Sequence, residues 1–139
     1  MKQTIMIEKI AIDTNILVYL RDTNKSEKFY QALEIMTLLP VVSAQVISEY
    51  LNVTKRLFKL TKQEIINICL NDLENCPIQA VKLSTLNLAK KLILRYDFQL
   101  FDSIVVAAAL EAGCNILYSE DLQHELIVEK QLKIVNPFI

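Results

Sequence analysis

The chain has 139 residues, of which 53% are hydrophobic, so it can build one apolar core and we expect a single domain over residues 1–139. Its net charge of −1 excludes a protein that coats nucleic acid by bulk electrostatics, and any such contact needs a local basic patch. Cys69, Cys76 and Cys114 are odd in number and lack C-x-x-C spacing, which excludes a disulfide framework and a thiolate zinc site.

Several common sequence signals are missing. Residues 1–9 contain no apolar run of signal-peptide length, and no stretch approaches the roughly 20 apolar residues that cross a bilayer. Gly113 is the only glycine, so there is no Gly-rich phosphate loop, and the single histidine, His124, has no nucleophile motif beside it. We expect a cytoplasmic protein with no membrane contact and with His124 in a surface loop.

The first half of the chain alternates short apolar runs with stretches of helical periodicity. Pro40 ends one helix, and Thr61 with Glu64 has capping-box spacing at the start of another. Helical spacing places Val46 and Tyr50 on one face of an intervening helix. The predicted elements are a strand at residues 10–13, a brief helix at 14–20, a helix at 26–39, a strand at 41–43, and helices at 45–58 and 61–73.

The second half continues the alternation. Residues 104–110 are apolar all round, which predicts a helix buried on more than one side, and Gly113 is expected in a left-handed cap after it. Ser84 is the expected N-cap of the helix before. The other predicted elements are short strands at residues 78–81, 115–118 and 132–135, and a polar turn at 119–124. Strands and helices in this order predict an α/β fold with a parallel sheet covered on both faces.

Four acids are placed to meet at one edge of that sheet. Ligands gather beyond the carboxyl ends of parallel strands, and Asp13 and Asp121 both follow predicted strands. Asp102 begins a helix that faces the same edge, and Glu49 lies in the first turns of another. Because clustered carboxylates oppose each other's ionisation, a divalent cation would relieve the conflict. Oxygen ligands without a Cys/His cluster favour Mg²⁺ or Mn²⁺.

Each acid also has an ordinary structural explanation. Asp13 suits an Asx-turn or a helix N-cap, and Asp102 suits a plain N-cap. Glu49 suits a solvated helix position and Asp121 a loop acid. Spacing alone therefore leaves both interpretations open.

Four sequence motifs resemble those of PIN domains (PilT N-terminus), in the family's order and over most of the chain. The first is I-D-T-N-I-L-V-Y from residue 12, and the second is V-I-S-E ending at Glu49. The third, F-D-S-I-V-V-A, contains Asp102, and the fourth, Y-S-E-D, ends at Asp121. The chain departs from the family after Asp121, where relatives usually have glycines, and this leaves open the role of Glu120 or Glu125.

The resemblance implies a three-layer α/β/α sandwich and Mg²⁺- or Mn²⁺-dependent endoribonuclease activity on single-stranded or structured RNA. It implies that Asp13, Glu49, Asp102 and Asp121 are the catalytic and metal-binding residues, with Asn15 and Ser119 in supporting positions. A bare domain of this kind looks like the toxins of virulence-associated protein BC systems. These are usually homodimers that a cognate antitoxin protein inhibits.

A basic run follows the helix that contains Glu49. Lys55, Arg56, Lys59 and Lys62 have no acid between them, and Arg21, Lys25 and Lys28 follow Asp13. The ordinary interpretation is a solvated helix face, and the functional one is contact with an RNA backbone near the metal.

Two other functions remain open from the residues. A receiver- or phosphatase-like phosphate-handling domain also gathers acids at strand ends, although D-T-N lacks a second Asp and no Lys follows a late strand as expected. A non-catalytic PIN-like module in an RNA-processing complex would keep the fold without binding metal.

Overall fold

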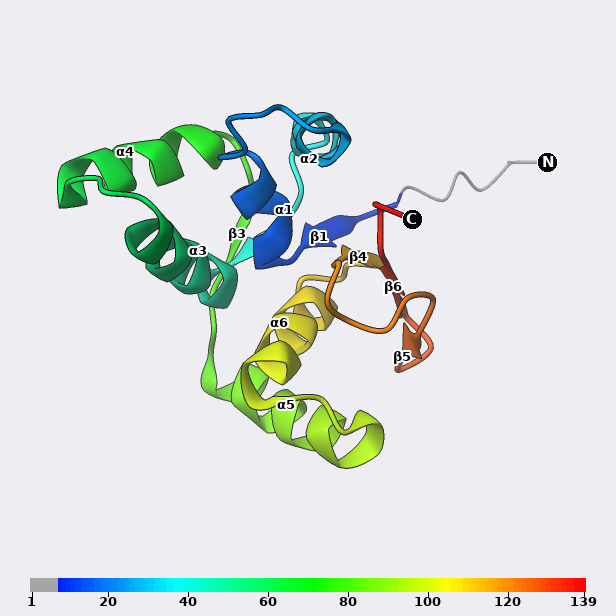
Figure 1. Cartoon of the computed structure of the whole chain (residues 1–139). Coiled ribbons are helices and arrows are strands. Elements are labelled where there is room, and N and C mark those ends of the chain that lie inside the picture. The colour runs from blue at the N-terminus through cyan, green and yellow to red at the C-terminus, as the bar shows by residue number, and fades with distance from the viewer. Residues whose placement is uncertain (1–7) are drawn as a thin grey trace.

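The computed structural model describes residues 8–139, in which short strands alternate with helices as predicted (Figure 1). Residues 1–7, most of the segment in which no signal peptide was expected, lie outside the described residues. In the described part of the chain, no helix is both long and apolar enough to cross a membrane. The elements are β1 (Ile10–Ile12), α1 (Thr14–Tyr19), α2 (Glu27–Thr37), β2 (Val42–Ser43), α3 (Ala44–Leu57), α4 (Lys62–Asp72), β3 (Ile78–Gln79), α5 (Leu83–Tyr96), α6 (Leu100–Glu111), β4 (Ile116–Tyr118), β5 (Ile127–Val128) and β6 (Leu132–Val135).

The central sheet has four strands in the order β1-β4-β6-β5, of which the first three are parallel. Leu117 of β4 pairs with Ala11 of β1 and with Ile134 of β6, and all three side chains are buried. Strands β2 and β3 form a separate parallel pair, which joins this sheet through a bridge between Ala11 and Val41. In Figure 1, α1 and α2 lie above these strands and α5 and α6 below them, which confirms the predicted three-layer α/β/α fold.

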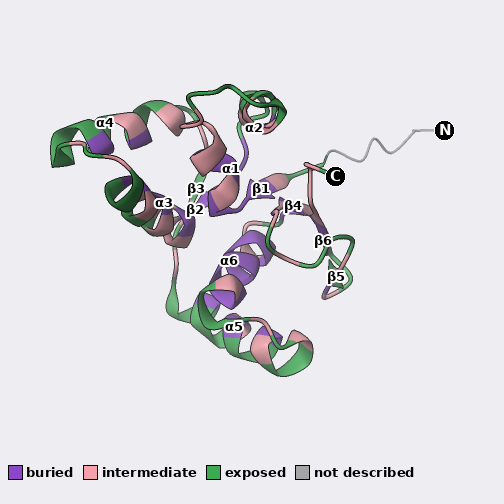
Figure 2. Cartoon of the chain, viewed as in Figure 1, coloured by how far each residue is buried: buried purple, intermediate pink, exposed green. Residues whose placement is uncertain are grey.

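Helix α6 is buried over its central and C-terminal part, as the apolar run at residues 104–110 predicts, while its first turn is exposed (Figure 2). Every residue from Ser103 to Leu110 is buried, and α5 packs along the helix. The alanines of α6 let neighbouring elements approach closely because they add little volume. Gly113 follows with φ of 77° and donates its N–H to the Leu110 carbonyl, the left-handed helix end that was expected there. This rigid helix holds Asp102 in its first turn.

Three local predictions need correction. The strand at 78–81 is shorter, Ile78–Gln79, and the strand Ile127–Val128 was not predicted. Helix α5 starts after Lys82 rather than at Ser84, because the Thr85 hydroxyl accepts a hydrogen bond from the Lys82 N–H and fixes an earlier N-terminus. The capping box of Thr61 and Glu64 at the start of α4 is confirmed.

A partly buried polar network holds α3 and α4 against the end of α1. The Tyr50 hydroxyl donates to Asp72 Oδ2 at 2.5 Å, and Arg21 Nη2 donates to Asp72 Oδ1 at 3.0 Å. Burial raises the pKa of Asp72, while the hydrogen bond from Tyr50 and the charge of Arg21 oppose that rise. The network fixes the orientation of α3, the helix that contains Glu49.

Replacing Tyr50 with phenylalanine should lower the free energy of unfolding by about 1–2 kcal/mol, because the partly buried Asp72 carboxylate loses a hydrogen-bond donor. Urea unfolding of the purified variant would measure the loss. Tyr30→Phe is the matched control. Tyr30 is 57% exposed, so this variant should be as stable as wild type. Equal stability of Tyr50→Phe and wild type would contradict the role given to this network.

Candidate functional site

The four predicted acids are placed by elements that converge on one end of the sheet. Asp13 directly follows β1, and its N–H donates to the carbonyl of Tyr118, the last residue of β4, at 2.9 Å. Asp121 lies three residues after β4, in the loop that this strand leads into. Because β1 and β4 are parallel neighbours, both acids lie at the same edge.

Asp13 is the most buried of the four acids, with 5% of its surface exposed. Its Oδ1 accepts from the Thr14 N–H and its Oδ2 from the Ser119 hydroxyl, both at 2.8 Å. The N-cap interpretation of Asp13 is therefore confirmed, since it caps α1. Capping alone does not account for its burial or for the second hydrogen bond from across the sheet edge.

Polar side chains from α1 and α3 hold two of the other acids. Thr14 Oγ1 donates to Glu49 Oε2 at 2.6 Å, and Gln45 Nε2 donates to Glu49 Oε1 at 3.2 Å. Asn15 Nδ2 donates to Asp121 Oδ2 at 3.2 Å. Sequence reasoning missed Thr14 and Gln45 as partners of Glu49, although Thr14 lies inside the D-T-N motif and offered a signal.

Asp102 lies in the first turn of α6 but does not cap it, because the N-cap is Gln99. The plain N-cap interpretation of Asp102 is therefore wrong. Ser119 is one of the two expected supporting residues, and it contacts more than Asp13. Its Oγ also accepts hydrogen bonds from the N–H of Asp121 and of Leu122, both at 3.3 Å. One hydroxyl thus connects the first acid to the loop that contains the fourth.

The charges of the neighbouring acids raise the pKa values of Asp13 and Asp102. Burial, opposed by the hydrogen bonds from Ser119 and Thr14 and reinforced by the charges of Glu49 and Asp102, raises the pKa of Asp13 from 3.8 to about 6. Burial also raises the pKa of Asp102, and the charges of Glu49 and Asp121 add to this effect. The carboxylates therefore lie close enough to oppose each other's ionisation, as expected from the sequence.

The donor set matches a hard divalent cation, because it consists of carboxylate oxygens that repel one another when ionised. Among residues 8–139, however, no three His, Cys, Asp or Glu side chains lie close enough together to share one metal ion. In this arrangement the oxygens of Asp13, Glu49 and Asp121 accept hydrogen bonds from protein donors. Binding a metal would require the carboxylates to come closer together than they lie in this arrangement.

A pocket of about 390 Å³ opens beside the acids, between α1 and α3. Glu49 and Asp121 line it together with the expected supporting residue Asn15. A larger groove of about 890 Å³ lies between α3 and α4 and includes none of the four acids in its lining. The chemistry of the smaller pocket, rather than the size of the larger one, identifies the candidate site.

The expected RNA-binding cations fall into two groups. Arg21 and Lys28 are already paired, with Asp72 at 3.0 Å and Glu120 at 2.9 Å. The second group, which is exposed and makes no ion pair within residues 8–139, comprises Lys25, Lys55, Arg56, Lys59 and Lys62. His124 lies in an exposed loop as expected, and its Nδ1 accepts a hydrogen bond from the Asn136 N–H at 2.9 Å.

Comparison with solved structures finds the same fold at low sequence identity. VapC20 of Mycobacterium tuberculosis, described as a sarcin-ricin loop cleaving toxin, has a TM-score of 0.63 and 17% identity, covering 81% of this chain and 90% of its own. A toxin-antitoxin complex from Klebsiella pneumoniae has a TM-score of 0.67 and 16% identity, with coverages of 94% and 98%. VapBC2 from Rickettsia felis, bound to a DNA fragment from its promoter, has a TM-score of 0.61 and 18% identity, with coverages of 90% and 96%.

Sequence comparison identifies the family. No curated protein sequence matches the chain. The sequence profile of the PIN domain matches residues 10–129, which include all four acids and every strand except β6. This match spans most of the chain and agrees with the order of the four motifs, so the chain belongs to the PIN-domain family.

Proposed function

We propose that this protein is a metal-dependent endoribonuclease that acts in the cytoplasm as the toxin of a toxin-antitoxin pair. The observation that carries the proposal is the gathering of acidic side chains at one edge of the parallel sheet, around Asp13, which is buried and accepts hydrogen bonds from Thr14 and Ser119. Membership of the PIN-domain family and the fold shared with solved toxins support the same function.

In this proposal Asp13, Glu49, Asp102 and Asp121 hold Mg²⁺ or Mn²⁺. Such an ion, when bound, lowers the pKa of a water and offsets charge on the phosphate in phosphodiester cleavage. Ser119 keeps Asp13 oriented through its 2.8 Å hydrogen bond. Asn15 and Thr14 do the same for Asp121 and Glu49, so these donors hold the acids at one edge of the sheet, and the carboxylates would come closer together around a bound ion.

RNA would approach over the exposed cations of α3. Lys55 and Arg56 lie in the last turn of α3, nearly two turns beyond Glu49 and so about 9 and 10.5 Å further along its axis. Both are exposed. Arg56, seven residues after Glu49, lies on nearly the same face of the helix and would contact a phosphate next to the acids. Lys55 lines the groove between α3 and α4 and would contact the RNA further along its path.

Reversing the charge of Lys55 and Arg56 to Glu should weaken RNA binding by roughly 10-fold and reduce the slope of log affinity against log salt by about 1–2. Fluorescence anisotropy with single-stranded RNA in chelator, where no cleavage occurs, would measure both. Reversal of Lys91 in α5 and Lys133 in β6, two other exposed cations, is the control and should have a smaller effect. Unchanged affinity and slope would remove Lys55 and Arg56 from the RNA path.

A cognate antitoxin and a second copy of the chain are the proposed protein partners. The solved toxin-antitoxin complex of the same fold supports the first. Large apolar side chains that a partner would cover are exposed on α5 and at the start of α6: Leu83, Leu86, Leu94, Leu100 and Phe101. We assign this surface to the second copy, and light scattering of the purified protein would report a dimer.

The test of the proposed function is cleavage of a mixed-sequence single-stranded RNA by purified protein with Mg²⁺, with Mn²⁺ and with chelator. Cleavage that needs the metal is the expected result. Well-folded, partner-free protein that neither cleaves RNA nor binds metal would instead support a non-catalytic interaction module. A stable phosphoaspartyl adduct after incubation with acetyl phosphate would favour a phosphate-handling domain.

A further inference from the structure

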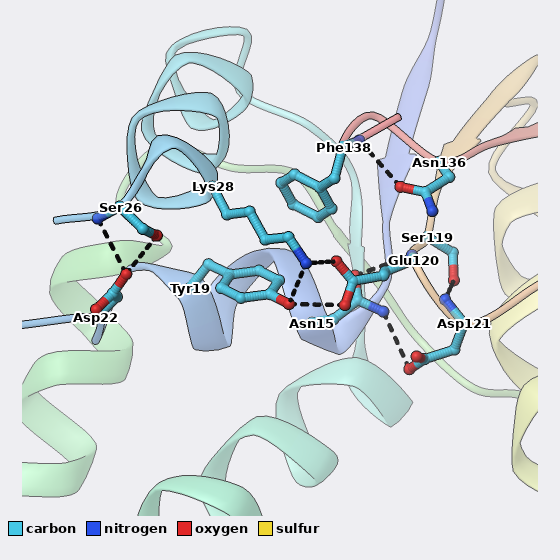
Figure 3. A network of polar contacts seen from close by, with 10 residues as sticks. All are labelled: Asn15, Tyr19, Asp22, Ser26, Lys28, Ser119, Glu120, Asp121, Asn136 and Phe138. Atoms are coloured by element: carbon cyan, nitrogen blue, oxygen red, sulfur yellow. Dashed lines mark hydrogen bonds and ion pairs between the residues drawn. The ribbon is translucent and has the colours of Figure 1, made fainter. Parts of the chain in front are cut away.

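The carboxylate of Glu120 points toward Tyr19 and Lys28 rather than toward its neighbour Asp121, and these two side chains hold it (Figure 3). Tyr19 OH donates to Glu120 Oε1 at 2.7 Å, and Lys28 Nζ donates to Glu120 Oε2 at 2.9 Å. Lys28 Nζ also donates to the Tyr19 hydroxyl at 3.2 Å. The three polar groups therefore form a closed triangle between the end of α1, the start of α2 and the loop after β4.

Two aromatic rings lie beside the ammonium group of this triangle. Lys28 Nζ lies 5.1 Å from the centre of the Tyr19 ring and 5.6 Å from that of Phe138. The two rings pack edge to face with their centres 5.0 Å apart. Although 43% of the Lys28 side chain is exposed, the carboxylate, the hydroxyl and the two rings together favour its position beside Glu120.

The loop connects this triangle to the candidate metal ligand. Asn15 Oδ1 accepts from the Glu120 N–H at 3.3 Å, while Asn15 Nδ2 donates to Asp121 Oδ2 at 3.2 Å. The side-chain amide of Asn15 thus contacts both Glu120 and Asp121. If Glu120 moves, its backbone N–H moves away from Asn15 Oδ1. Asn15 is then no longer held in place, and Asp121 loses its fixed position.

We propose that Lys28, with Tyr19, is a positioning residue that acts through Glu120 to hold Asp121 toward the other acids. This rests on the proposed function, because Asp121 matters in this way only if the acids bind metal. The triangle also keeps a fifth carboxylate out of the site. Glu120 is paired with Lys28 and so does not compete with Asp121 for the metal. It assigns a role to Glu120, which the missing glycines after Asp121 had left open.

Mn²⁺ affinity of the full-length protein, measured by calorimetry, tests the proposal. Lys28→Met and Glu120→Gln should each weaken Mn²⁺ binding by roughly 10-fold, the range found when groups that orient metal ligands are lost. The double variant should be no weaker than either single one, because both changes break the same contact. Non-additivity of this kind separates positioning through Glu120 from general loss of stability.

A second ion pair provides the matched control. Arg95 pairs with Glu129 at 2.6 Å, away from the four acids and with a similar exposure of the carboxylate partner. Arg95→Met should leave Mn²⁺ affinity unchanged. Wild-type affinity in Lys28→Met, or multiplied losses in the double variant, would overturn the positioning role while leaving the nuclease proposal intact. Wild-type protein that binds no Mn²⁺ would overturn both.

Discussion

Replacing Asp13 with asparagine should reduce RNA cleavage by at least about 100-fold, more than the loss typical of groups that only orient metal ligands. Asn keeps the size of the side chain and one carbonyl oxygen for the hydrogen bond from Thr14 or Ser119, so the fold should remain. What it removes is a negative charge at the most buried of the four acids. Single-turnover cleavage at saturating Mg²⁺ would measure the effect.

Asp97→Asn is the control for this substitution. Asp97 is exposed at the end of α5 with φ of 57°, a left-handed conformation that Asn also adopts readily. Its cleavage rate should equal that of wild type. Asp102→Asn should resemble Asp13→Asn, because the charges of both acids are coupled. Cleavage that survives in both Asp13→Asn and Asp102→Asn would rule out the metal mechanism.

The parts of the fold that the sequence predicted are those with strong local patterns. The apolar run in α6 predicted a helix buried on more than one side because no face of it is polar. Leu117 lies in a short apolar run that could be predicted as a central strand, and it has no exposed surface.

The parts that the sequence did not predict depend on tertiary contacts. Strand β5 has two residues, too few for any periodicity, and it exists because Val128 pairs with Leu132 across a tight turn. In that turn Glu129 and Lys130 both have positive φ. Glycine usually occupies such positions, and without one the sequence gives no signal for the turn.

The same division holds in the site. The positions of Asp13 and Asp121 follow from the general behaviour of parallel strands, so topology alone placed them at one edge. The contact between Lys28 and Glu120 joins residues 92 positions apart on different elements, and no periodicity relates them. Sequence reasoning therefore grouped Lys28 with the RNA-binding cations, whereas the structure pairs it with an acid.

Asp13 should also make the metal-free protein less stable as the pH rises. Its pKa is raised from 3.8 to about 6, so the folded state binds the proton more tightly than the unfolded state does. The penalty for ionising the buried carboxyl is absent well below pH 3.8, grows as the pH rises, and is complete above about pH 6. Its full size is about 3 kcal/mol.

Urea unfolding of wild type and Asp13→Asn in chelator would isolate this penalty, because the other carboxyl groups titrate in both proteins. The stability difference should shift in favour of Asp13→Asn by about 2 kcal/mol between about pH 4 and pH 7. Parallel pH profiles would show that burial of Asp13 carries no such cost.

Divalent metal should then stabilise wild type more than Asp13→Asn. A cation that binds only the folded state stabilises it by mass action, and it also offsets the repulsion that Glu49 and Asp102 exert on Asp13. Added Mn²⁺ at neutral pH should therefore raise the melting temperature of wild type more than that of Asp13→Asn. Equal shifts in the two proteins would mean that the ion binds elsewhere. A larger shift in wild type would show that Asp13, the acid that destabilises the metal-free protein, also contributes to the metal site that the proposed nuclease requires.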